Sequence, residues 1–231
     1  MSLLLRPSGH VGGDLVGFFP SGAGRLGVFA IDVSGHGVTS ALLTARLAGL
    51  FSGAVPEQNI ALMPDPSGGF VGRPPAQVAA AMNRLMLEEV ATDHYCTLVH
   101  AEIELATGAV RMVQAGHPHP MVQRACGGIE FLGVGGLPVG LIPGADYAGL
   151  ETVLHPGDRL LIMSDGVTEC PRREGGDLGE DGLRDIMLRL MGLRGQAFLD
   201  ALVDELVGIA GSSEFPDDIS AALVEYHGPP G

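Results

Sequence analysis

Residues 95–105 read YCTLVHAEIEL, and after the turn ATG at 106–108 the chain continues as AVRMVQA at 109–115. The first stretch alternates, with mainly apolar residues at its odd positions and the charged Glu102 and Glu104 at even positions. Alternation with a period of two on both sides of a glycine-containing turn predicts an antiparallel hairpin. A hairpin in the middle of the chain favours antiparallel sheets over a parallel series of βαβ units.

Other segments on both sides of this hairpin have the patterns of helices and short strands. Apolar residues recur at helical spacing in 38–51, in 75–90 and in 182–209. Short strands are expected at 25–31, 121–123, 158–164 and 219–226, and a loop rich in Pro, Gly and Asp at 56–74. Early and late helices around hairpin-linked strands predict an α+β layered sandwich, and 231 residues suit a single domain over 1–231.

The composition excludes several classes of function. With 13 basic and 27 acidic residues the net charge is −14, which disfavours binding to nucleic acid and to anionic membranes. No apolar run approaches the roughly 20 residues that span a bilayer, and no signal peptide precedes the core. Cys96, Cys126 and Cys170 are widely spaced and form no CxxC pair, which indicates free thiols in a reducing compartment. We therefore expect a cytoplasmic protein.

Acidic residues stand at the ends of several predicted strands. Asp14 lies in a glycine turn, Asp32 and Asp165 each follow an apolar run, and Asp217 and Asp218 precede the last strand. If the strand ends converge, such carboxylates raise one another's pKa unless a cation neutralises them. Oxygen ligands without a nearby Cys pair or HxxxH suit Mg²⁺ or Mn²⁺ rather than zinc. The alternative is that each Asp simply caps a turn or a helix.

Five strings occur in order along the chain: VGGD at 11–14, IDVSGHGVTSALL at 31–43, AGHPHP at 115–120, PGDRLLIMSDGVTE at 156–169 and DDIS at 217–220. Together they resemble the metal-dependent serine/threonine phosphatases of the type 2C superfamily, in the bacterial branch named after the sporulation phosphatase SpoIIE. The resemblance covers nearly the whole chain. It implies a four-layer α-β-β-α sandwich with two central antiparallel sheets and a metal site at one edge.

The resemblance also implies which residues bind metal. It implies two Mn²⁺ or Mg²⁺ ions and the following ligands: Asp14, Asp32, the backbone carbonyl of Val33, Asp165 and Asp217, with the neighbouring Asp218 ranked below Asp217. Asp32 is expected to bridge the two ions. Asp14, Asp32 and Asp165 would thus form the catalytic centre.

The sequence departs from the family pattern at one position and leaves another open. Many relatives have an acidic residue three positions after the GGD aspartate, where this chain has Gly17. Larger relatives hold phosphate with an upstream arginine; Arg6 is the only arginine before Asp14, and a surface role is the preferred interpretation. The amino end of the helix expected from Val38 could bind the anion instead.

Three histidines in the motifs have alternative interpretations. His36, within SGHG, could act as a general acid toward the departing serine oxygen, or it could only hold backbone groups of a turn. His117 and His119 could form a zinc pair, but Pro118 and Pro120 favour a rigid exposed turn.

The leading functional hypothesis is a phosphatase that hydrolyses phosphoserine or phosphothreonine on a protein partner by a metal-activated water. Cys170 lacks the Cys-x₅-Arg loop of cysteine phosphatases. The resemblance implies an anti-anti-sigma-type protein as substrate, a sensor or receiver module upstream in a longer regulatory protein, and a possible homodimer. The alternative is a partner-binding module with weak or no turnover, which Gly17 favours; a different metallohydrolase is a weaker third option.

Overall fold

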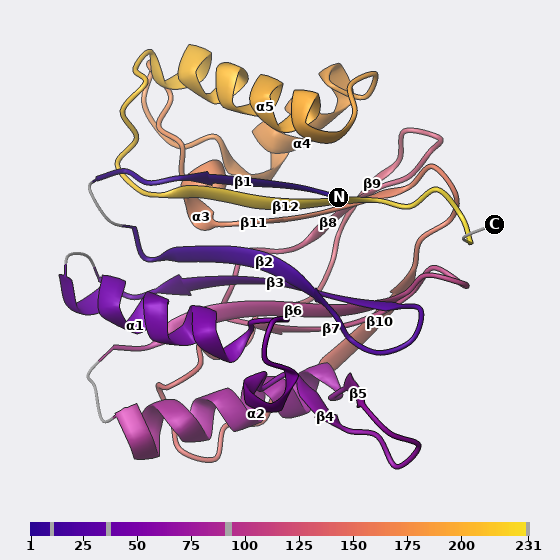
Figure 1. Cartoon of the computed structure of the whole chain (residues 1–231). Helices are drawn as coiled ribbons and strands as arrows, with labels where there is room; N and C mark the ends of the chain where they lie inside the picture. Colours follow the sequence, from indigo (N-terminus) through magenta and orange to yellow (C-terminus); the bar gives the residue numbers. More distant parts are fainter. Residues whose placement is uncertain (10–11, 36–37, 91–93, 230–231) are drawn as a thin grey trace.

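Two antiparallel sheets stack face to face at the centre of the molecule (Figure 1). The structure is a computed structural model and describes residues 1–9, 12–35, 38–90 and 94–229. Sheet I has the order β1-β12-β11-β8-β9 and is built from β1 (Ser2–Arg6), β8 (Met121–Gln123), β9 (Ile129–Phe131), β11 (Arg159–Met163) and β12 (Ile219–Glu225). Sheet II has the order β10-β7-β6-β3-β2 and is built from β2 (Asp14–Pro20), β3 (Arg25–Val33), β6 (Cys96–Glu104), β7 (Ala109–Ala115) and β10 (Gly149–Val153).

Helices cover the outer face of each sheet, so the molecule has four layers (Figure 1). Sheet I is covered by α3 (Asp165–Thr168), α4 (Gly179–Arg189) and α5 (Gly195–Ala210). Sheet II is covered by α1 (Val38–Leu50) and α2 (Pro75–Leu85), and α2 continues as the π-helical turn Met86–Val90. A 3-10 turn (Pro56–Gln58) and the small hairpin of β4 (Leu62–Pro64) and β5 (Phe70–Gly72) connect α1 to α2. The predicted α-β-β-α sandwich is confirmed.

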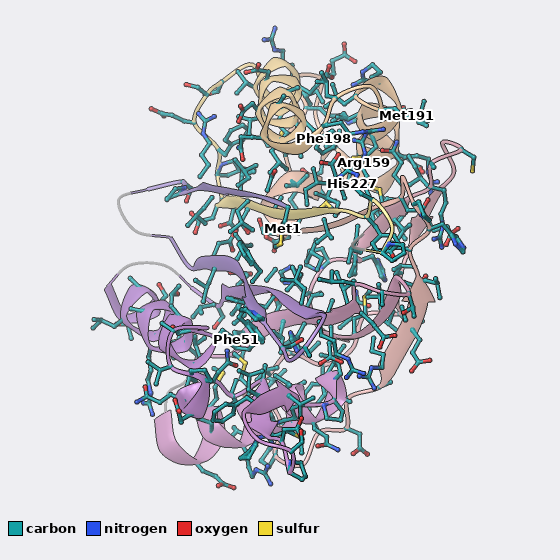
Figure 2. All side chains as sticks on the ribbon, turned by 45° about the vertical axis from the view of Figure 1, so that its right-hand side comes forward. Met1, Phe51, Arg159, Met191, Phe198 and His227 are labelled. Carbon is teal, nitrogen blue, oxygen red and sulfur yellow. The ribbon has the colours of Figure 1, made fainter. Side chains whose placement is uncertain are left out.

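Three apolar layers follow from the alternation along the strands. Val28 and Ala30 of β3 lie between the sheets, whereas Phe29 and Ile31 point to the helices α1 and α2. Phe51 packs in the layer between sheet II and its covering helices, and Phe198 of α5 packs in the layer between sheet I and its covering helices (Figure 2). Because successive side chains point to opposite faces, each central strand contributes to two cores.

One buried arginine ties α5 to sheet I. Arg159 on β11 is 2% exposed, and its guanidinium lies 5.2 Å from the centre of the Phe198 ring (Figure 2). It donates to the carbonyl of Met191 at 2.5 Å and lies 3.8 Å from a carboxylate oxygen of Glu225. The charge is therefore buried with a carboxylate and a carbonyl beside it.

The hairpin at 95–115 is confirmed as β6–β7, but several other predictions were coarser than the structure. Asp14 was expected in a turn and instead opens β2. The helical region 182–209 is two helices, α4 and α5, and Gly211 in the left-handed region ends the second. The predicted loop 56–74 contains the β4–β5 hairpin, and β10 was not predicted. These short strands depend on neighbours distant in sequence, so local alternation gives little signal for them.

In the part of the chain that the structure describes, no helix is both long and apolar enough to cross a membrane.

Candidate active site

Asp14 and Asp32 lie opposite each other at the end of sheet II. They are register partners in the antiparallel pair β2–β3. Val16 is two residues from Asp14 on β2, and Ala30 is two residues from Asp32 on β3; both pack between the sheets. Since side chains two apart share a face, both carboxylates point toward sheet I. Asp14 is 5% exposed and Asp32 is half-buried.

Asp165 approaches this point from sheet I. It is the first residue of α3, separated from the end of β11 only by Ser164, and is half-buried. Ser164 before it donates from Oγ to the carbonyl of Asp218 at 3.2 Å and accepts the backbone N–H of Ser220 at 2.9 Å. An added Cβ on Gly166 would lie 2.1 Å from the carbonyl oxygen of Asp218. A glycine is thus required for α3 to lie this close to residues 217–218.

The adjacent Asp217 and Asp218 have different surroundings. The Asp218 carboxylate accepts from the backbone N–H of Ser8 at 2.7 Å and from its hydroxyl at 3.1 Å. It also accepts from the backbone N–H of Gly13 at 2.7 Å and of Asp14 at 3.3 Å. Asp217 is exposed. Among the described residues, its side chain accepts one hydrogen bond, from the backbone N–H of Asp218 at 2.8 Å. Asp218 therefore links the residues before β2 to the segment before β12. Asp217 makes fewer hydrogen bonds and is the more available ligand.

The carboxylates at this edge affect one another's ionisation. Burial raises the pKa of Asp14 to about 8, and the nearby Asp32 contributes in the same direction. Burial also raises the pKa of Asp32 to about 7, followed by the charges of Asp165 and Asp217. The pKa of Asp165 is raised by burial and then by Asp217. Six acidic groups thus converge at this edge: the five aspartates picked out in the sequence and, in addition, Glu169.

The donor set fits a hard divalent cation. Asp14 Oδ2 is buried and has no hydrogen-bond partner among the described residues. A bound cation would satisfy this oxygen and relieve the repulsion between the carboxylates. Val33, whose carbonyl is the predicted backbone ligand, ends β3 and donates its N–H to the carbonyl of Gly13 at 3.3 Å. Within the described ranges, no three His, Cys, Asp or Glu side chains are already arranged around a point that could hold a metal.

A cavity of about 310 Å³ adjoins this acidic edge. It runs from Asp165 and Thr168 of α3 to Thr97 at the start of β6 and to the segment after β7. His117 is buried there and its Nδ1 lies 2.8 Å from Thr97 Oγ1; burial lowers its pKa to about 4. His119 instead pairs with Glu180 at 2.7 Å. The two histidines have different partners, which does not favour a zinc pair.

Two other positions from the sequence analysis, Arg6 and Gly17, have clear surroundings in the structure. Arg6 donates to the carbonyl of Ser213 at 2.6 Å and lies over the ring of Phe215, which supports its surface interpretation. Gly17 lies opposite Phe29, and an added Cβ there would be 2.7 Å from the ring. The glycine thus makes room for a core phenylalanine. His36 lies outside the described residues.

Three contributors to the site were not identified from sequence. Glu169 is four residues after Asp165, within the SDGVTE string, and that helical spacing was the available signal. Ser8 binds Asp218, and Thr44 of α1 donates to the carbonyl of Gly13 at 3.1 Å. Ser8 and Thr44 meet their partners only through folding, so no local pattern marks them.

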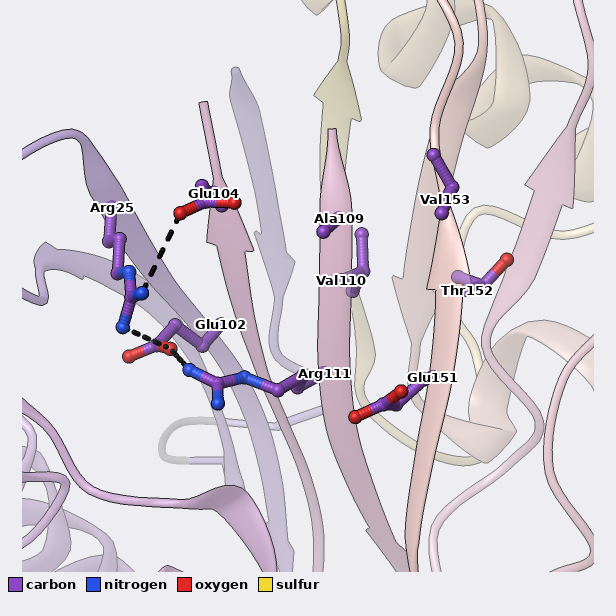
Figure 3. Close-up of a pocket in the computed structure, with 9 residues that line it drawn as sticks. All are labelled: Arg25, Glu102, Glu104, Ala109, Val110, Arg111, Glu151, Thr152 and Val153. Carbon is purple, nitrogen blue, oxygen red and sulfur yellow. Dashed lines mark hydrogen bonds and ion pairs between the residues drawn. The ribbon is translucent and has the colours of Figure 1, made fainter. Parts of the chain in front are cut away.

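A second cavity, of about 410 Å³, lies at the opposite end of sheet II (Figure 3). Arg25 is 3.4 Å from Glu102 and 3.6 Å from Glu104, and Arg111 is ion-paired with the buried Glu102. Both arginines are therefore ion-paired with carboxylates that line the same cavity. Such a neutralised network does not favour a phosphate site.

Comparison with known proteins agrees with this geometry. The family model described as Stage II sporulation protein E (SpoIIE) matches residues 22–227. The chain belongs to the SpoIIE family. The phosphoserine phosphatase RsbP of Bacillus subtilis is 28% identical over 166 residues, which are 70% of this chain and 38% of RsbP. The phosphoserine phosphatase RsbU of the same organism is 25% identical over 202 residues, 87% of this chain and 56% of RsbU. The matched region thus spans about half of the length of these relatives, 38% of RsbP and 56% of RsbU.

Solved structures show the same fold. The SiaA-PP2C domain of Pseudomonas aeruginosa has a TM-score of 0.79 at 19% identity, over 97% of this chain and 85% of that one. The PP2C phosphatase domain of SpoIIE from Bacillus subtilis has a TM-score of 0.75 at 20% identity, over 97% of this chain and 62% of that one. These matches place the SpoIIE-family chain in the PP2C fold.

Proposed function

We propose that this domain is a metal-dependent phosphatase that hydrolyses phosphoserine or phosphothreonine on a regulatory protein. The observation that carries the proposal is the convergence of Asp14, Asp32, Asp165 and Asp217 from both sheets on one edge. Burial and neighbouring carboxylates raise the pKa of Asp14, Asp32 and Asp165, so the ionised forms are unfavourable without a cation and their proximity supports a cation-dependent function. The names of RsbP and RsbU, both phosphoserine phosphatases, support the same activity.

The proposed ligands are the four carboxylates and the carbonyl of Val33, and two Mn²⁺ or Mg²⁺ ions are the proposed cofactors. When bound, such ions supply a hydroxide at neutral pH and neutralise the charge on the phosphoryl oxygens. Asp14 and Asp32 must release their protons for this, because buried carboxyls with a pKa of about 8 and 7 are partly protonated at neutral pH. Asp218 acts through the amides of Gly13 and Asp14, which it holds in place.

Two of the cysteines are unsuited to a covalent mechanism. Cys96 and Cys170 are both buried, and burial raises the pKa of both thiols. A thiol that stays protonated is a poor nucleophile. Their surroundings favour direct attack by water over a cysteinyl-phosphate intermediate.

The proposed substrate is a phosphorylated partner of the anti-anti-sigma type. The proposal also includes an upstream sensor or receiver module and a homodimer, as the resemblance implies. The additional module is supported by the greater length of RsbP and RsbU, of which the matched region is 38% and 56%.

A partner-binding module without turnover is the second candidate, and Gly17 was its main support. The packing of Phe29 against Gly17 gives that glycine a structural reason, so the glycine by itself does not single out a domain without turnover. Hydrolysis separates the two candidates. The experiment measures p-nitrophenyl phosphate turnover with Mn²⁺, Mg²⁺ or EDTA in the wild type, in Asp165→Ala and in the control Asp200→Ala, whose carboxylate is exposed on α5.

Metal-dependent turnover in the wild type and Asp200→Ala, and its loss in Asp165→Ala, would support the phosphatase. Absence of turnover with every metal, or unchanged turnover in Asp165→Ala, would contradict it.

A further inference from the structure

The segment between β9 and β10 exposes an unusual number of apolar side chains. Within residues 132–142, Val134 is 95% exposed, and three others are between 42% and 47% exposed: Leu137, Leu141 and Ile142. Single exposed apolar residues are common on protein surfaces, but several on one short segment indicate a contact surface. We call residues 132–142 the apolar loop.

Two buried amide side chains hold the apolar loop to the body of the domain. Asn83 of α2 donates to the carbonyl of Ile142 at 3.0 Å and accepts the N–H of Gly140 at 2.7 Å. Gln114 of β7 accepts the N–H of Gly135 at 2.8 Å. Asn83 and Gln114 are 3% and 5% exposed. Buried hydrogen bonds of this kind fix a backbone in one conformation, so the exposed side chains are presented on a rigid frame.

The apolar loop adjoins the cavity of the candidate active site. Gly135 lines that cavity together with Asp165 and Thr168. Gln114, which binds Gly135, also donates to the carbonyl of His117 at 2.7 Å, and His117 is in the cavity wall as well. The exposed Val134 immediately precedes Gly135 in the chain, so the apolar surface begins at the rim of the cavity.

The cavity by itself is too small to account for binding of a phosphoprotein. Its volume of about 310 Å³ holds a side chain, whereas stable protein partners bury about 800 Å² each. Affinity for a protein substrate must therefore come in part from contacts beside the cavity, and the apolar loop is the apolar surface at its rim.

We propose that the apolar loop is the docking surface for the phosphoprotein substrate, and that it binds apolar side chains next to the phosphorylated residue. The inference rests on the proposed phosphatase function and specifies its substrate class. A surface that is rigid before binding loses little conformational freedom on binding, which favours recognition by a few apolar contacts.

The test compares three substrates: p-nitrophenyl phosphate, a phosphoserine peptide with Leu and Val beside the phosphoserine, and the same peptide with Ser and Gln there. The variants are Val134→Asp and Leu137→Ser. The matched control is Val153→Asp, because Val153 is also an exposed valine, 44% exposed, and lies on β10. Val153 pairs with Ala109, at the end of β7 that lies away from the active-site cavity.

We expect wild-type protein to prefer the apolar peptide in kcat/KM by roughly tenfold, a ratio within reach of burying one aliphatic side chain. Val134→Asp and Leu137→Ser should lose most of this preference while their turnover of p-nitrophenyl phosphate stays unchanged. Val153→Asp should behave as wild type with all three substrates.

Several results would overturn the inference. Wild type that hydrolyses p-nitrophenyl phosphate but treats the two peptides alike overturns the docking surface alone, as does a preference that survives in both loop variants. Wild type that hydrolyses none of the substrates overturns the proposed function and this inference with it. A Val134→Asp variant that turns a dimer into a monomer without changing the peptide preference assigns the loop to contacts between copies.

Discussion

Asp14 and Asp32 lie directly opposite each other on β2 and β3, with both carboxylates on the face turned toward sheet I. Burial raises the pKa of Asp14 to about 8, and the charge of Asp32 acts in the same direction. Burial, followed by the charges of Asp165 and Asp217, raises the pKa of Asp32 to about 7. In the metal-free protein these groups retain protons at a pH where ordinary carboxyls are ionised. The pair therefore links proton release, metal binding and stability.

The first prediction concerns the pH dependence of the metal-free protein. Between about pH 4 and pH 8 the folded state binds more protons at Asp14 and Asp32 than the unfolded state does. Their contribution to the free energy of unfolding must therefore fall as the pH rises through this range. Urea unfolding in EDTA at pH 5, 6.5 and 8 measures it, and Asp32→Asn should flatten the decline. An equal decline in Asp32→Asn would show that other groups cause it.

The second prediction concerns metal addition. Mn²⁺ or Mg²⁺ should raise the unfolding midpoint. At a metal concentration a hundredfold above Kd, the free energy of unfolding should rise by roughly 2.7 kcal/mol. The rise should be larger at pH 8 than at pH 6, because bound protons compete with the metal at Asp14 and Asp32. Thermal unfolding with and without metal measures both effects. A rise of the same size in Asp165→Ala would contradict the placement of Asp165 in the site.

The third prediction separates Asp217 from Asp218. Asp218→Ala should destabilise the fold by about 2 kcal/mol or more, since it leaves the amides of Gly13 and Ser8 without their acceptor. Asp217→Ala should cost little stability and should weaken metal binding instead. Urea unfolding in EDTA and a Mn²⁺ titration of both variants give the comparison. Equal loss of stability in the two variants would contradict the distinction.

The fourth prediction tests the reason for Gly17. Gly17→Ala should destabilise the protein by about 1–3 kcal/mol, because its Cβ would lie 2.7 Å from the Phe29 ring in a packed core. In the background of Phe29→Ala the same substitution should cost much less. A double-mutant cycle measures this coupling. Additive effects would mean that Phe29 does not set the requirement for glycine.

The fifth prediction concerns the contact between α3 and residues 217–218. Gly166→Ala should reduce both metal affinity and stability, because the new methyl group would meet the carbonyl of Asp218 at 2.1 Å. Gly192→Ala is the control, since an added Cβ there has open space around it. Metal titration and thermal unfolding of both variants check the expectation. A Gly166→Ala protein that binds Mn²⁺ as tightly as wild type would contradict it.

The amino-acid sequence by itself determined the layer architecture and the family. The hairpin β6–β7 is encoded by a local period of two and a glycine turn, and helical periodicity marked α1 and α2. Asp32 and Asp165 could be identified as candidates because each follows a strand-like apolar run and Asp is rare within strands. Such features depend on neighbours in the chain, so they can be predicted without coordinates.

Only the tertiary structure decided how those residues meet. Asp14 faces Asp32 because of the register between β2 and β3, and a shift of one residue would turn the side chain to the other face. The role of Asp218 as a tie depends on Ser8, which is 210 residues away in sequence. The rigid presentation of Val134 depends on Gln114, through its hydrogen bond to Gly135. Contacts across such separations are set by the packing of whole sheets, for which no local pattern in the sequence carries a signal.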